Sequence, residues 1–412
     1  MAGRWLDTRL GDVLTLQRGF DLPAGDRRPG TFPVVASTGV VGTHREPMVE
    51  GPGVVIGRSG SLGGAQYVTG DFWPLNTTLW VKDFKGNDRR FCYYLLKSLN
   101  LQTFNVGSGV PTLNRNHVHP LPVRIPVDVN EQRTIAHILG TLDDRIELNR
   151  RMNETLEAMA RALFKSWFIE FDPVHAKAEG RDPGFSADIA ALFPDSFEDS
   201  DQGKIPKGWE VKTIGDLVDV VGGGTPSTKE PEYWSGRSHL WATPKDLSGL
   251  SVPVLVDTAR RITDAGLSQI SSGLLPIGTV LLSSRAPIGY LAIAESPTAI
   301  NQGFIAMLPK KTVSNVFVLL WAKVAHDDIV SRANGSTFLE INKANFRPIP
   351  VVGPTLDIMA AFDRQARTLY DRIVVNVRES STLATLRDTL LPKLLSGELR
   401  VKDVDRSMEA HA

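Results

Sequence analysis

Two long stretches of the chain carry apolar residues at alternating spacings of four and three, which is the pattern of a coiled-coil seam. The first seam comprises Ile135, Leu139, Leu142, Ile146, Asn149, Asn153, Leu156, Ala160, Leu163 and Trp167. The second comprises Phe362, Ala366, Leu369, Ile373, Asn376, Ser380, Leu383, Arg387, Leu390 and Leu394, at a constant offset of 227 positions. The pattern predicts two helices of about 35 residues, each ~50 Å long.

Helices of this length gain most of their stability by packing an amphipathic face, so we expect the two seams to pack on each other. Because a globular segment separates them, an antiparallel pair is the natural geometry. Asn149 and Asn376 occupy the same seam position. Buried asparagines there would fix the register of the helices. The alternative is that both are tolerated near a solvated edge, and the sequence leaves the two readings open.

The chain also contains an internal repeat outside these helices. Trp5–Gly19 matches Trp209–Gly223 at an offset of 204, and Gly107–Pro126 matches Gly335–Pro354 at an offset of 228 with seven identities in twenty. The growing offset predicts an insertion in the second copy, around Thr225–Leu255. Such a repeat indicates that one structural unit occurs twice in the fold.

The predicted fold class is α+β, with two pseudo-repeated mixed α/β domains separated by two long helices that form an antiparallel coiled coil. Strand-like runs (Gly53–Ile56, Thr279–Leu282, Ala292–Ala294) and short helical segments (Arg90–Leu99, Val316–Val324) support the mixed class. The expected divisions are a first domain (1–126), a first helix (127–175), an acidic surface linker (176–207), a second domain (208–353), a second helix (354–400) and a tail (401–412).

Composition narrows the class of protein. A hydrophobic fraction of 42% in 412 residues can supply packed cores, and the single cysteine, Cys92, excludes a disulfide framework or a cysteine-ligated zinc site. No apolar run is long enough to span a membrane, and the first residues lack the apolar segment of a signal peptide. We therefore expect a cytoplasmic protein without a membrane partner.

The net charge of zero becomes informative when it is divided by segment. Residues 1–125 carry +5, 126–175 carry −3, 176–207 carry −3, 208–353 carry +1 and 354–412 carry 0. This distribution suits a protein that contacts DNA through limited surfaces and leaves part of the phosphate neutralisation to partners. Ordinary surface variation is the alternative, which charge alone does not reject for the second domain.

Motifs of catalysis are missing from the sequence. It has no phosphate-binding GxxxxGK[ST] loop, no HExxH and no GxSxG. His117 and His119 have no third ligand nearby in the sequence, so we expect a structural role for them and no metal site. A repeated module on a coiled-coil spacer, without a catalytic constellation, indicates recognition of two half-sites at a fixed distance.

Several stretches in this order resemble the specificity (S) subunit of type I restriction–modification systems, over essentially the whole chain. They are QRGFDLP (17–23), GRSG (57–60), NEQRTI (130–135), LFKSWFIEFD (163–172), PVHAKAEGRDP (173–183), IPKGW (205–209), WATPKDL (241–247) and LLPKLLSGELRV (390–401). The resemblance implies a non-catalytic DNA-binding subunit of a prokaryotic phage-defence system. Two target recognition domains would each read one half of a bipartite, asymmetric duplex DNA site.

The resemblance also implies partners and their cofactors. Two methyltransferase (M) subunits, which methylate adenine N6 with S-adenosylmethionine, would dock on the helices, and restriction/translocase (R) subunits would bring ATP and magnesium. No cofactor is expected in this chain itself. The second helix departs from the pattern because its opening, Leu356–Ala361, has no Glu-Gln-Arg. Its M subunit would then use different contacts.

Base edges and phosphates are read mainly by Arg, Lys, Asn, Gln, Ser and Thr side chains. The candidates in the first domain are Arg18, Arg58, Ser59, Ser61, Asn76, Thr77, Ser108 and Arg115. Those in the second are Thr225, Ser227, Lys229, Tyr233, Lys245, Asp246, Arg285, Asn301, Gln302, Ser336 and Lys343. Residues shared by the copies should serve the scaffold or phosphates, so Asn114 and Asn342 are expected to be structural turn residues, and base readers should lie where the copies differ.

Two other hypotheses come from different classes. One is a bivalent coiled-coil scaffold that reads no DNA, and binding assays would separate it from the DNA-recognition subunit. The other is a self-contained restriction–methylation enzyme, which needs a cofactor motif that the sequence lacks.

Overall fold

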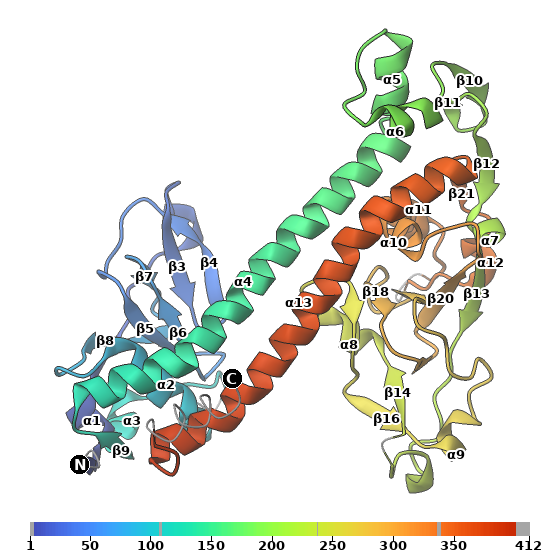
Figure 1. Ribbon diagram of the computed structural model, residues 1–412. Helices are drawn as coiled ribbons and strands as arrows, with labels where there is room; N and C mark the ends of the chain where they lie inside the picture. The colour runs from blue at the N-terminus through green and yellow to red at the C-terminus, as the bar shows by residue number, and fades with distance from the viewer. Residues whose placement is uncertain (1–3, 107–108, 237, 336–338, 401–412) are drawn as a thin grey trace. The chain divides into compact units, whose positions relative to one another are not determined.

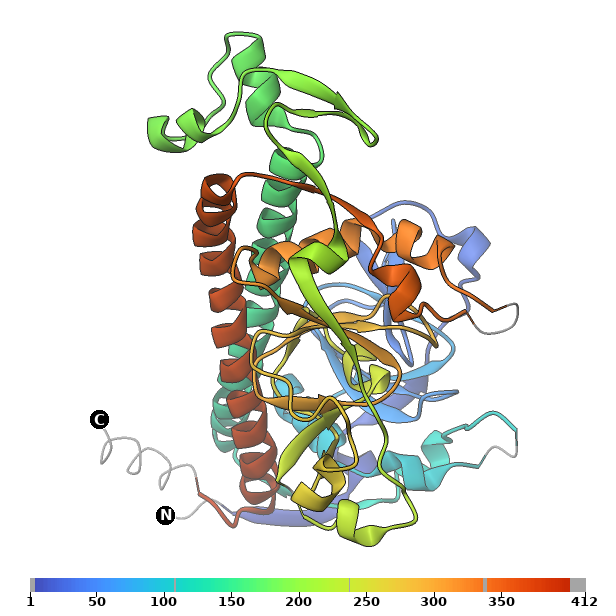
Figure 2. The same cartoon turned by 90° about the vertical axis from the view of Figure 1, so that its right-hand side faces the viewer.

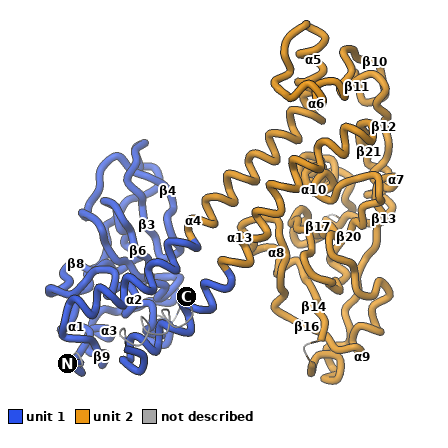
Figure 3. The backbone as a smooth tube through the Cα atoms, in the orientation of Figure 1, with its two compact units in different colours: residues 1–146, 381–412 blue, residues 147–380 orange. Residues whose placement is uncertain are grey.

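The computed structural model describes residues 4–106, 109–236, 238–335 and 339–400. The chain divides into two compact units, shown in different colours in Figure 3. The first unit contains residues 1–146 and 381–412, and the second contains residues 147–380. Both long helices cross the division, so each unit contains a part of each helix.

The first unit is built on a four-stranded antiparallel sheet with the order β2-β8-β5-β6 and a smaller sheet with the order β4-β3-β7 (Figure 1). Strands β1 and β9 form a separate antiparallel pair. The elements are β1 (Trp5–Arg9), α1 (Leu10–Val13), β2 (Thr15–Arg18), η1 (Ala24–Asp26), β3 (Phe32–Ala36), β4 (Gly39–His44), β5 (Gly53–Gly57), β6 (Gly63–Val68), β7 (Trp73–Pro74), β8 (Thr78–Asp83), α2 (Arg89–Ser98), η2 (Leu101–Phe104), α3 (Arg115–Val118) and β9 (Pro122–Pro126).

The core of this unit joins the larger sheet to helices. Buried side chains of β5 and β8, such as Ile56 and Leu79, share one apolar cluster with Phe91 of α2. The same cluster contains Leu139 and Leu394, which come from the two long helices. The domain is therefore built directly onto its end of the helix pair, and the carboxylate of Asp88 caps α2 by accepting a hydrogen bond from the Phe91 amide at 2.8 Å.

The second unit has a five-stranded sheet with the order β13-β20-β17-β18-β15, a three-stranded sheet with the order β16-β14-β19, and the pair β12-β21. Its elements after the first long helix are α5 (Asp172–Ala178), α6 (Ala187–Leu192), β10 (Phe197–Ser200), β11 (Gly203–Pro206), β12 (Glu210–Thr213), α7 (Ile214–Leu217), β13 (Val218–Gly222), η3 (Pro231–Tyr233), β14 (His239–Ala242), α8 (Pro244–Ser248), β15 (Val254–Leu255), β16 (Arg260–Ile262), α9 (Asp264–Leu267), β17 (Val280–Ser283), β18 (Leu291–Ala294), β19 (Thr298–Ile300), β20 (Phe304–Pro309), α10 (Asn315–Val324), α11 (His326–Ser331), α12 (Lys343–Phe346) and β21 (Pro350–Gly353).

The two domains repeat one plan. The pairs β1/β12, α1/α7, β2/β13, β5/β17, β8/β20, α2/α10, α3/α12 and β9/β21 follow each other in the same order and make the same strand pairings. The strand-like runs predicted from the sequence lie in β5, β17 and β18, and the predicted short helices are α2 and α10. The predicted fold class, two repeated mixed α/β domains with two long helices, is confirmed.

The long helices are α4 (Val129–Phe168) and α13 (Leu356–Ser396), and they lie side by side (Figure 2). In the first unit Asp143 of α4 contacts Arg387. In the second unit Asn153 contacts Asn376. Because numbers rise along α4 as they fall along α13, the helices are antiparallel, as predicted.

The seam positions differ in burial. Those that are buried are Ile135, Leu139, Asn149, Asn153, Ala160, Trp167, Phe362, Ala366, Ile373, Asn376 and Leu394. Those that are half-buried are Leu142, Ile146, Leu156, Leu163, Leu369, Ser380, Leu383, Arg387 and Leu390. Every predicted seam position is thus at least partly covered.

The two seam asparagines settle the question that their sequence position left open. Asn149 and Asn376 are both 0% exposed, so the reading that placed them at a solvated edge is wrong. Asn149 Nδ2 donates to Glu379 Oε2 at 2.9 Å, and Asn376 Nδ2 donates to Asn153 Oδ1 at 2.8 Å. The amides form a buried polar network between the helices, of the kind that fixes register in coiled coils.

The segment predicted as a surface linker, residues 176–207, contains the end of α5, all of α6 and the β10–β11 hairpin. Phe185 and Phe193 pack edge-to-face on Trp167, with ring centroids 5.4 and 4.9 Å away. These aromatic contacts anchor the polar segment to the end of α4. Within the described ranges, no helix is both long and apolar enough to cross a membrane.

Candidate nucleic-acid interface

Three arginines line a hollow of about 590 Å³ in the first domain. Arg18 ends β2, Arg58 follows β5, and Arg115 opens α3. Strands β2 and β5 are both antiparallel to β8, so they run in the same direction and end at the same edge of the sheet. This topology brings together side chains that lie far apart in the sequence.

The cations at this edge differ in their partners. Arg18 lies 3.7 Å from Asp21, and both side chains are more than half exposed. The Arg58 guanidinium donates to the Asn76 carbonyl at 3.2 Å, and the Asn76 amide donates to Asp21. The Arg115 guanidinium has no hydrogen-bond or ion-pair partner among the described residues. Arg115 is therefore the cation of this hollow that is most available for a phosphate.

The second domain repeats this edge. Arg285 follows β17 and lies 3.5 Å from Glu340, with its side chain 39% exposed. Lys343 opens α12 beside the end of β13, where a Cβ on Gly222 would come within 3.7 Å of the ammonium nitrogen. Arg58 and Arg285 follow the equivalent strands β5 and β17, and Arg115 and Lys343 open the equivalent helices α3 and α12.

Other candidates join this second edge. The carboxamide oxygen of Asn301 accepts a hydrogen bond from the Gly303 amide at 2.9 Å, which shapes the turn before β20. The Thr225 hydroxyl donates to the carboxamide of Gln302, and both side chains are exposed. The structure therefore brings Thr225, Asn301 and Gln302 into one turn cluster.

A tryptophan–arginine stack, which sequence reasoning missed, organises the insertion of the second domain. The Arg260 guanidinium lies 3.7 Å from the Trp234 ring centroid and 5.2 Å from that of Trp241. Trp234 Nε1 donates to the Ser227 carbonyl at 3.0 Å, and Trp241 Nε1 donates to the Gly224 carbonyl at 3.1 Å. The stack fixes the loop that carries three exposed or half-exposed candidates, Ser227, Lys229 and Tyr233.

This stack borders a further hollow of about 470 Å³, lined by Trp234 and residues 257–261. Arg261 contacts Asp257 at 2.9 Å, and Arg260 is exposed beyond its stacking face. The doubled arginine that opens β16 is the sequence signal of this hollow.

Some of the candidate residues make hydrogen bonds that stabilise the fold. The Asp246 carboxylate accepts hydrogen bonds from Thr243 at 2.6 and 2.8 Å and from the Ala259 amide at 2.8 Å. The Thr77 hydroxyl accepts from the Ser37 amide at 3.4 Å, and Ser59 forms a β-bridge with Thr112. The side chains of two other candidates, Ser61 and Lys245, are exposed. The remaining candidates, Ser108 and Ser336, lie outside the described residues.

The turn asparagines and the histidine pair take structural roles. Asn114 caps α3 and Asn342 caps α12, each accepting a backbone hydrogen bond, which confirms their predicted role. His119 Nε2 accepts a hydrogen bond from the Leu16 amide at 3.0 Å, which confirms a structural role for this histidine. Burial lowers the pKa of His119, and Arg115 and Lys85 lower it further, so the ring is held neutral. Across the described residues, no cluster of His, Cys, Asp and Glu side chains suits a metal ion.

The first long helix begins with a Glu-Gln-Arg motif, and the glutamine of this motif is buried. Gln132 is 1% exposed, and its amide donates to Asn87 Oδ1 at 2.8 Å and to the Pro126 carbonyl at 2.9 Å. Its oxygen accepts from the Asp88 amide at 2.9 Å. Glu131 lies 3.4 Å from Arg400. The motif thus joins α4 to its own recognition domain.

Known proteins share this arrangement. The family described as type I restriction modification DNA specificity domain matches residues 3–158 and 206–367, once for each repeat. The HindI specificity subunit of Haemophilus influenzae is 28% identical over 339 residues, which cover 70% of this chain and 71% of that protein. The MjaIX specificity subunit of Methanocaldococcus jannaschii is 40% identical over 161 residues, 39% of this chain and 37% of that protein.

A solved structure shows the same fold. The S subunit of a type I restriction–modification system from M. genitalium superposes with a TM-score of 0.64 at 17% identity, covering 96% of both chains. The doubled family match is the sequence counterpart of the doubled fold described above. The chain belongs to the type I restriction–modification DNA specificity family, whose members are non-catalytic S subunits that recognise DNA sequence.

Proposed function

We propose that this chain reads a bipartite, asymmetric duplex DNA sequence, one half with each recognition domain, and docks methyltransferase and restriction subunits. One observation carries the DNA-reading part: both domains place cations at the same sheet edge, Arg58 and Arg115 in the first and Arg285 and Lys343 in the second. Shared cations suit phosphates, which are the same at every site. The chain itself performs no chemistry in this proposal.

The asymmetry of the target rests on the insertion. The segment between Gly223 and Arg285 is 23 residues longer than the segment between Gly19 and Arg58. It carries the loop held by the stack of Trp234 and Arg260. Because base readers differ where half-sites differ, we assign base contacts to this loop and to its shorter counterpart.

Docking of two M subunits is supported by apolar side chains left uncovered on the long helices. Leu148 and Met159 of α4 are 48% and 51% exposed. Their equivalents on α13, Val375 and Leu386, are 52% and 45% exposed. The same positions are exposed in both copies, as expected if two copies of one partner bind. S-adenosylmethionine would then be bound by the M subunits, and ATP with magnesium by the R subunits.

The most direct experiment maps modified adenines across a genome with this gene present and deleted, together with its M partner. The expected result is one motif made of two unlike half-sites and one gap, found only when the gene is present. A motif that persists after deletion, or a continuous single motif, would refute the proposal.

Binding of the purified complex with the M subunit tests the cations separately. Replacing Arg115 by alanine should weaken binding to all sequences and reduce the slope of log affinity against log salt by about 0.9, with base preference unchanged. Lys82→Ala, at an exposed position away from the hollow on β8, is the matched control. If the wild-type complex shows no salt-sensitive, sequence-selective binding, the chain is instead a bivalent coiled-coil scaffold that reads no DNA.

A further inference from the structure

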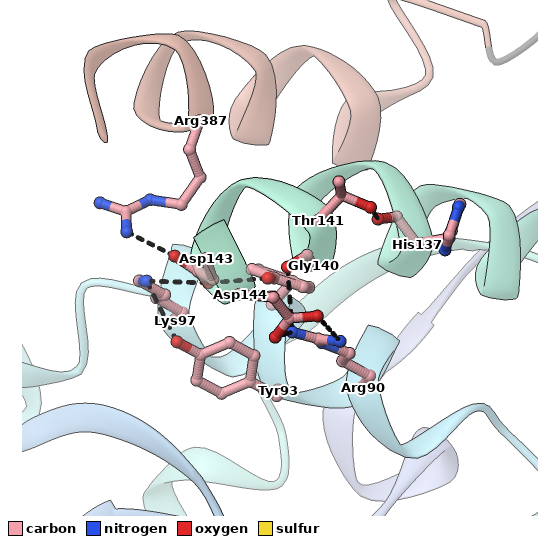
Figure 4. Close-up of polar contacts among 10 residues, drawn as sticks. Arg90, Tyr93, Lys97, His137, Gly140, Thr141, Asp143, Asp144 and Arg387 are labelled. Carbon is pink, nitrogen blue, oxygen red and sulfur yellow. Dashed lines mark hydrogen bonds and ion pairs between the residues drawn. The ribbon is translucent and has the colours of Figure 1, made fainter. Parts of the chain in front are cut away.

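A single carboxylate in the first unit connects three helices. Asp143 of α4 accepts a hydrogen bond from the Tyr94 hydroxyl of α2 at 2.7 Å, and the Arg387 guanidinium of α13 lies 2.6 Å from it (Figure 4). Lys97 of α2 is 3.8 Å away. The side chains of Asp143 and Arg387 are only 19% and 16% exposed. The recognition domain is thereby tied to both long helices through one group.

A second contact lies one residue further along α4. Arg90 of α2 binds both oxygens of Asp144 at 2.9 and 2.5 Å, and it also donates to the Gly140 carbonyl at 3.1 Å. A two-pronged contact of this kind fixes direction as well as distance. It holds α2 along α4 beside the Asp143 group.

The second unit contains the same three chemical groups. The Tyr370 hydroxyl of α13 donates to Glu295 Oε1 at 3.0 Å, and Glu295 directly follows β18 of the recognition domain. Arg378 of α13 donates to the Glu295 backbone carbonyl at 3.3 Å and lies 3.7 Å from its carboxylate. The Glu295 side chain is 14% exposed, and Tyr370 is 3% exposed. Each unit therefore has a tyrosine–carboxylate–arginine clamp, which joins the domain to α4 and α13 in the first unit and to α13 in the second, where the Arg378 side chain is 58% exposed.

The two clamps are not copies inherited from the repeat. Asp143 and Tyr370 are equivalent positions at the offset of 227, so the helix supplies the acid in one clamp and the tyrosine in the other. The acid of the second clamp comes from the strand end at Glu295, whereas the tyrosine of the first comes from α2. Because the same chemistry is reached with different residues, it reflects a requirement on the joint itself.

Both tyrosines stay protonated and therefore remain donors. Burial, with the adjoining carboxylate, raises the pKa of Tyr94 and of Tyr370. A directional hydrogen bond constrains an angle in a way that non-directional apolar packing does not. Each clamp therefore adds an angular constraint to the apolar contact between the domain and the helices.

We propose that the clamps around Asp143 and Glu295 are positioning sites that fix the angle of each recognition domain on its helices, and thereby restrict the number of base pairs between the half-sites. This inference rests on the proposed bipartite target. One extra base pair shifts a half-site by about 3.4 Å along the duplex and turns it by roughly 35°. A domain held by bonds of about 3 Å in this geometry cannot follow such a shift without breaking them.

The test uses the full chain with its M subunit and the variants Tyr94→Phe and Tyr370→Phe, each of which removes one hydroxyl. Tyr93→Phe is the matched control on α2, because the Tyr93 hydroxyl contacts Lys97 at 3.1 Å and not Asp143. Competition binding is measured on three duplexes, in which the gap between the half-sites has the native length, one base pair fewer or one base pair more. Modified adenines in cells give the same gap distribution independently.

The expected result is that each clamp variant loses about tenfold of its preference for the native gap, while both half-site sequences stay unchanged. The Tyr93→Phe control should keep the wild-type preference. Clamp variants that melt like the wild type and keep its gap preference would overturn the inference. If a tyrosine variant has a much lower melting temperature, Asp143→Asn and Glu295→Gln replace it, because they keep the shape of the side chain. Loss of the preference for the native gap in these variants supports the inference, and an unchanged preference overturns it.

Failure of the underlying function looks different. If the wild-type complex shows no two-part motif, the proposed function fails and the clamps with it. If the wild type shows the motif and the clamp variants retain one sharp gap, only the clamp inference fails.

Discussion

Replacing Gln132 by methionine tests whether the opening of α4 is a joint inside the molecule. Methionine is the residue at the equivalent position of the second long helix, Met359, which is 7% exposed. The exchange therefore imports a side chain that the other copy already accommodates. It removes the hydrogen bonds to Asn87, Asp88 and Pro126 while keeping an apolar stem of similar length.

The expected loss follows from those three bonds. Each contributes about 1 kcal/mol net, and the Pro126 carbonyl, on a buried residue, would be left without this partner at a further cost of about 1–3 kcal/mol. Burial of the methionine thioether offsets about 1–2 kcal/mol of this. The net destabilisation of the first unit is about 3 kcal/mol, which lowers its melting temperature by about 6–12 °C.

Differential scanning calorimetry of the full chain would measure this change. Hydrogen exchange at the amides of α2 and of the start of α4 would assign the affected transition to the first unit. Met359→Leu is the matched control and should cost less than about 1.5 kcal/mol. A shift below about 3 °C for Gln132→Met would refute the reasoning, since it would mean that the buried amide bonds contribute nothing to stability.

Three further predictions concern other buried polar groups. Asn149→Leu should stabilise the second unit by about 1–2 kcal/mol, because it removes a buried Oδ1 that has no partner among the described residues, and a lower melting temperature would contradict this. The contribution of His119 to the free energy of unfolding should be lost as the pH falls below about 6.5, since the pKa of this histidine is lowered in the folded state. His119→Gln should therefore flatten the pH dependence of the melting temperature. Lys323→Met should cost about 1–3 kcal/mol, because Glu157, 2.5 Å from the ammonium and 17% exposed, loses its counter-ion. Adding Glu157→Leu should recover most of that loss, and a double variant no more stable than the single one would argue against the ion-pair account.

The architecture could be read from the sequence because the features that specify it are local and duplicated. Gly, Pro and apolar residues matched at fixed offsets, so the same strands and short helices followed in both copies. The alternating spacing of four and three predicted the long helices. The domain that lies between them in the sequence predicted that they are antiparallel. Asn149 and Asn376 were located in the same way, although their burial was not decided until the structure placed them at 0% exposure.

The contacts that join distant segments could not be read in this way. Asp143 and Arg387 are 244 residues apart, and only the packing of α4 on α13 makes them neighbours. The connector shows the same limit, because its polar composition conceals Phe185 and Phe193, which pack on Trp167. Composition averages over a segment, whereas packing depends on the few side chains that face a neighbouring surface.

The Glu-Gln-Arg motif helps to identify the family, but it does not reveal the role of each of its residues. Its absence from the second helix suggested that the second M subunit would dock differently. The structure instead places Gln132 against Asn87, Asp88 and Pro126, inside the first unit. The second copy joins its domain by other means, with Ser314 bonded to Asp363 of α13 and Asn315 bonded to Arg367 of α13. Lack of the motif in α13 is therefore a difference in the joint, and different docking of the second M subunit stays a prediction.

The charge distribution can now be tied to particular groups. The first domain carries +5 over residues 1–125, and its hollow gathers Arg18, Arg58 and Arg115. The second domain carries only +1 over residues 208–353, and Arg285 there is neutralised in part by Glu340. If both halves of one DNA site are held equally well, the second domain must obtain more of its affinity from contacts other than long-range attraction. Under the proposed function, the loop fixed by Trp234 and Arg260 would supply additional surface for such contacts in the domain with the weaker charge.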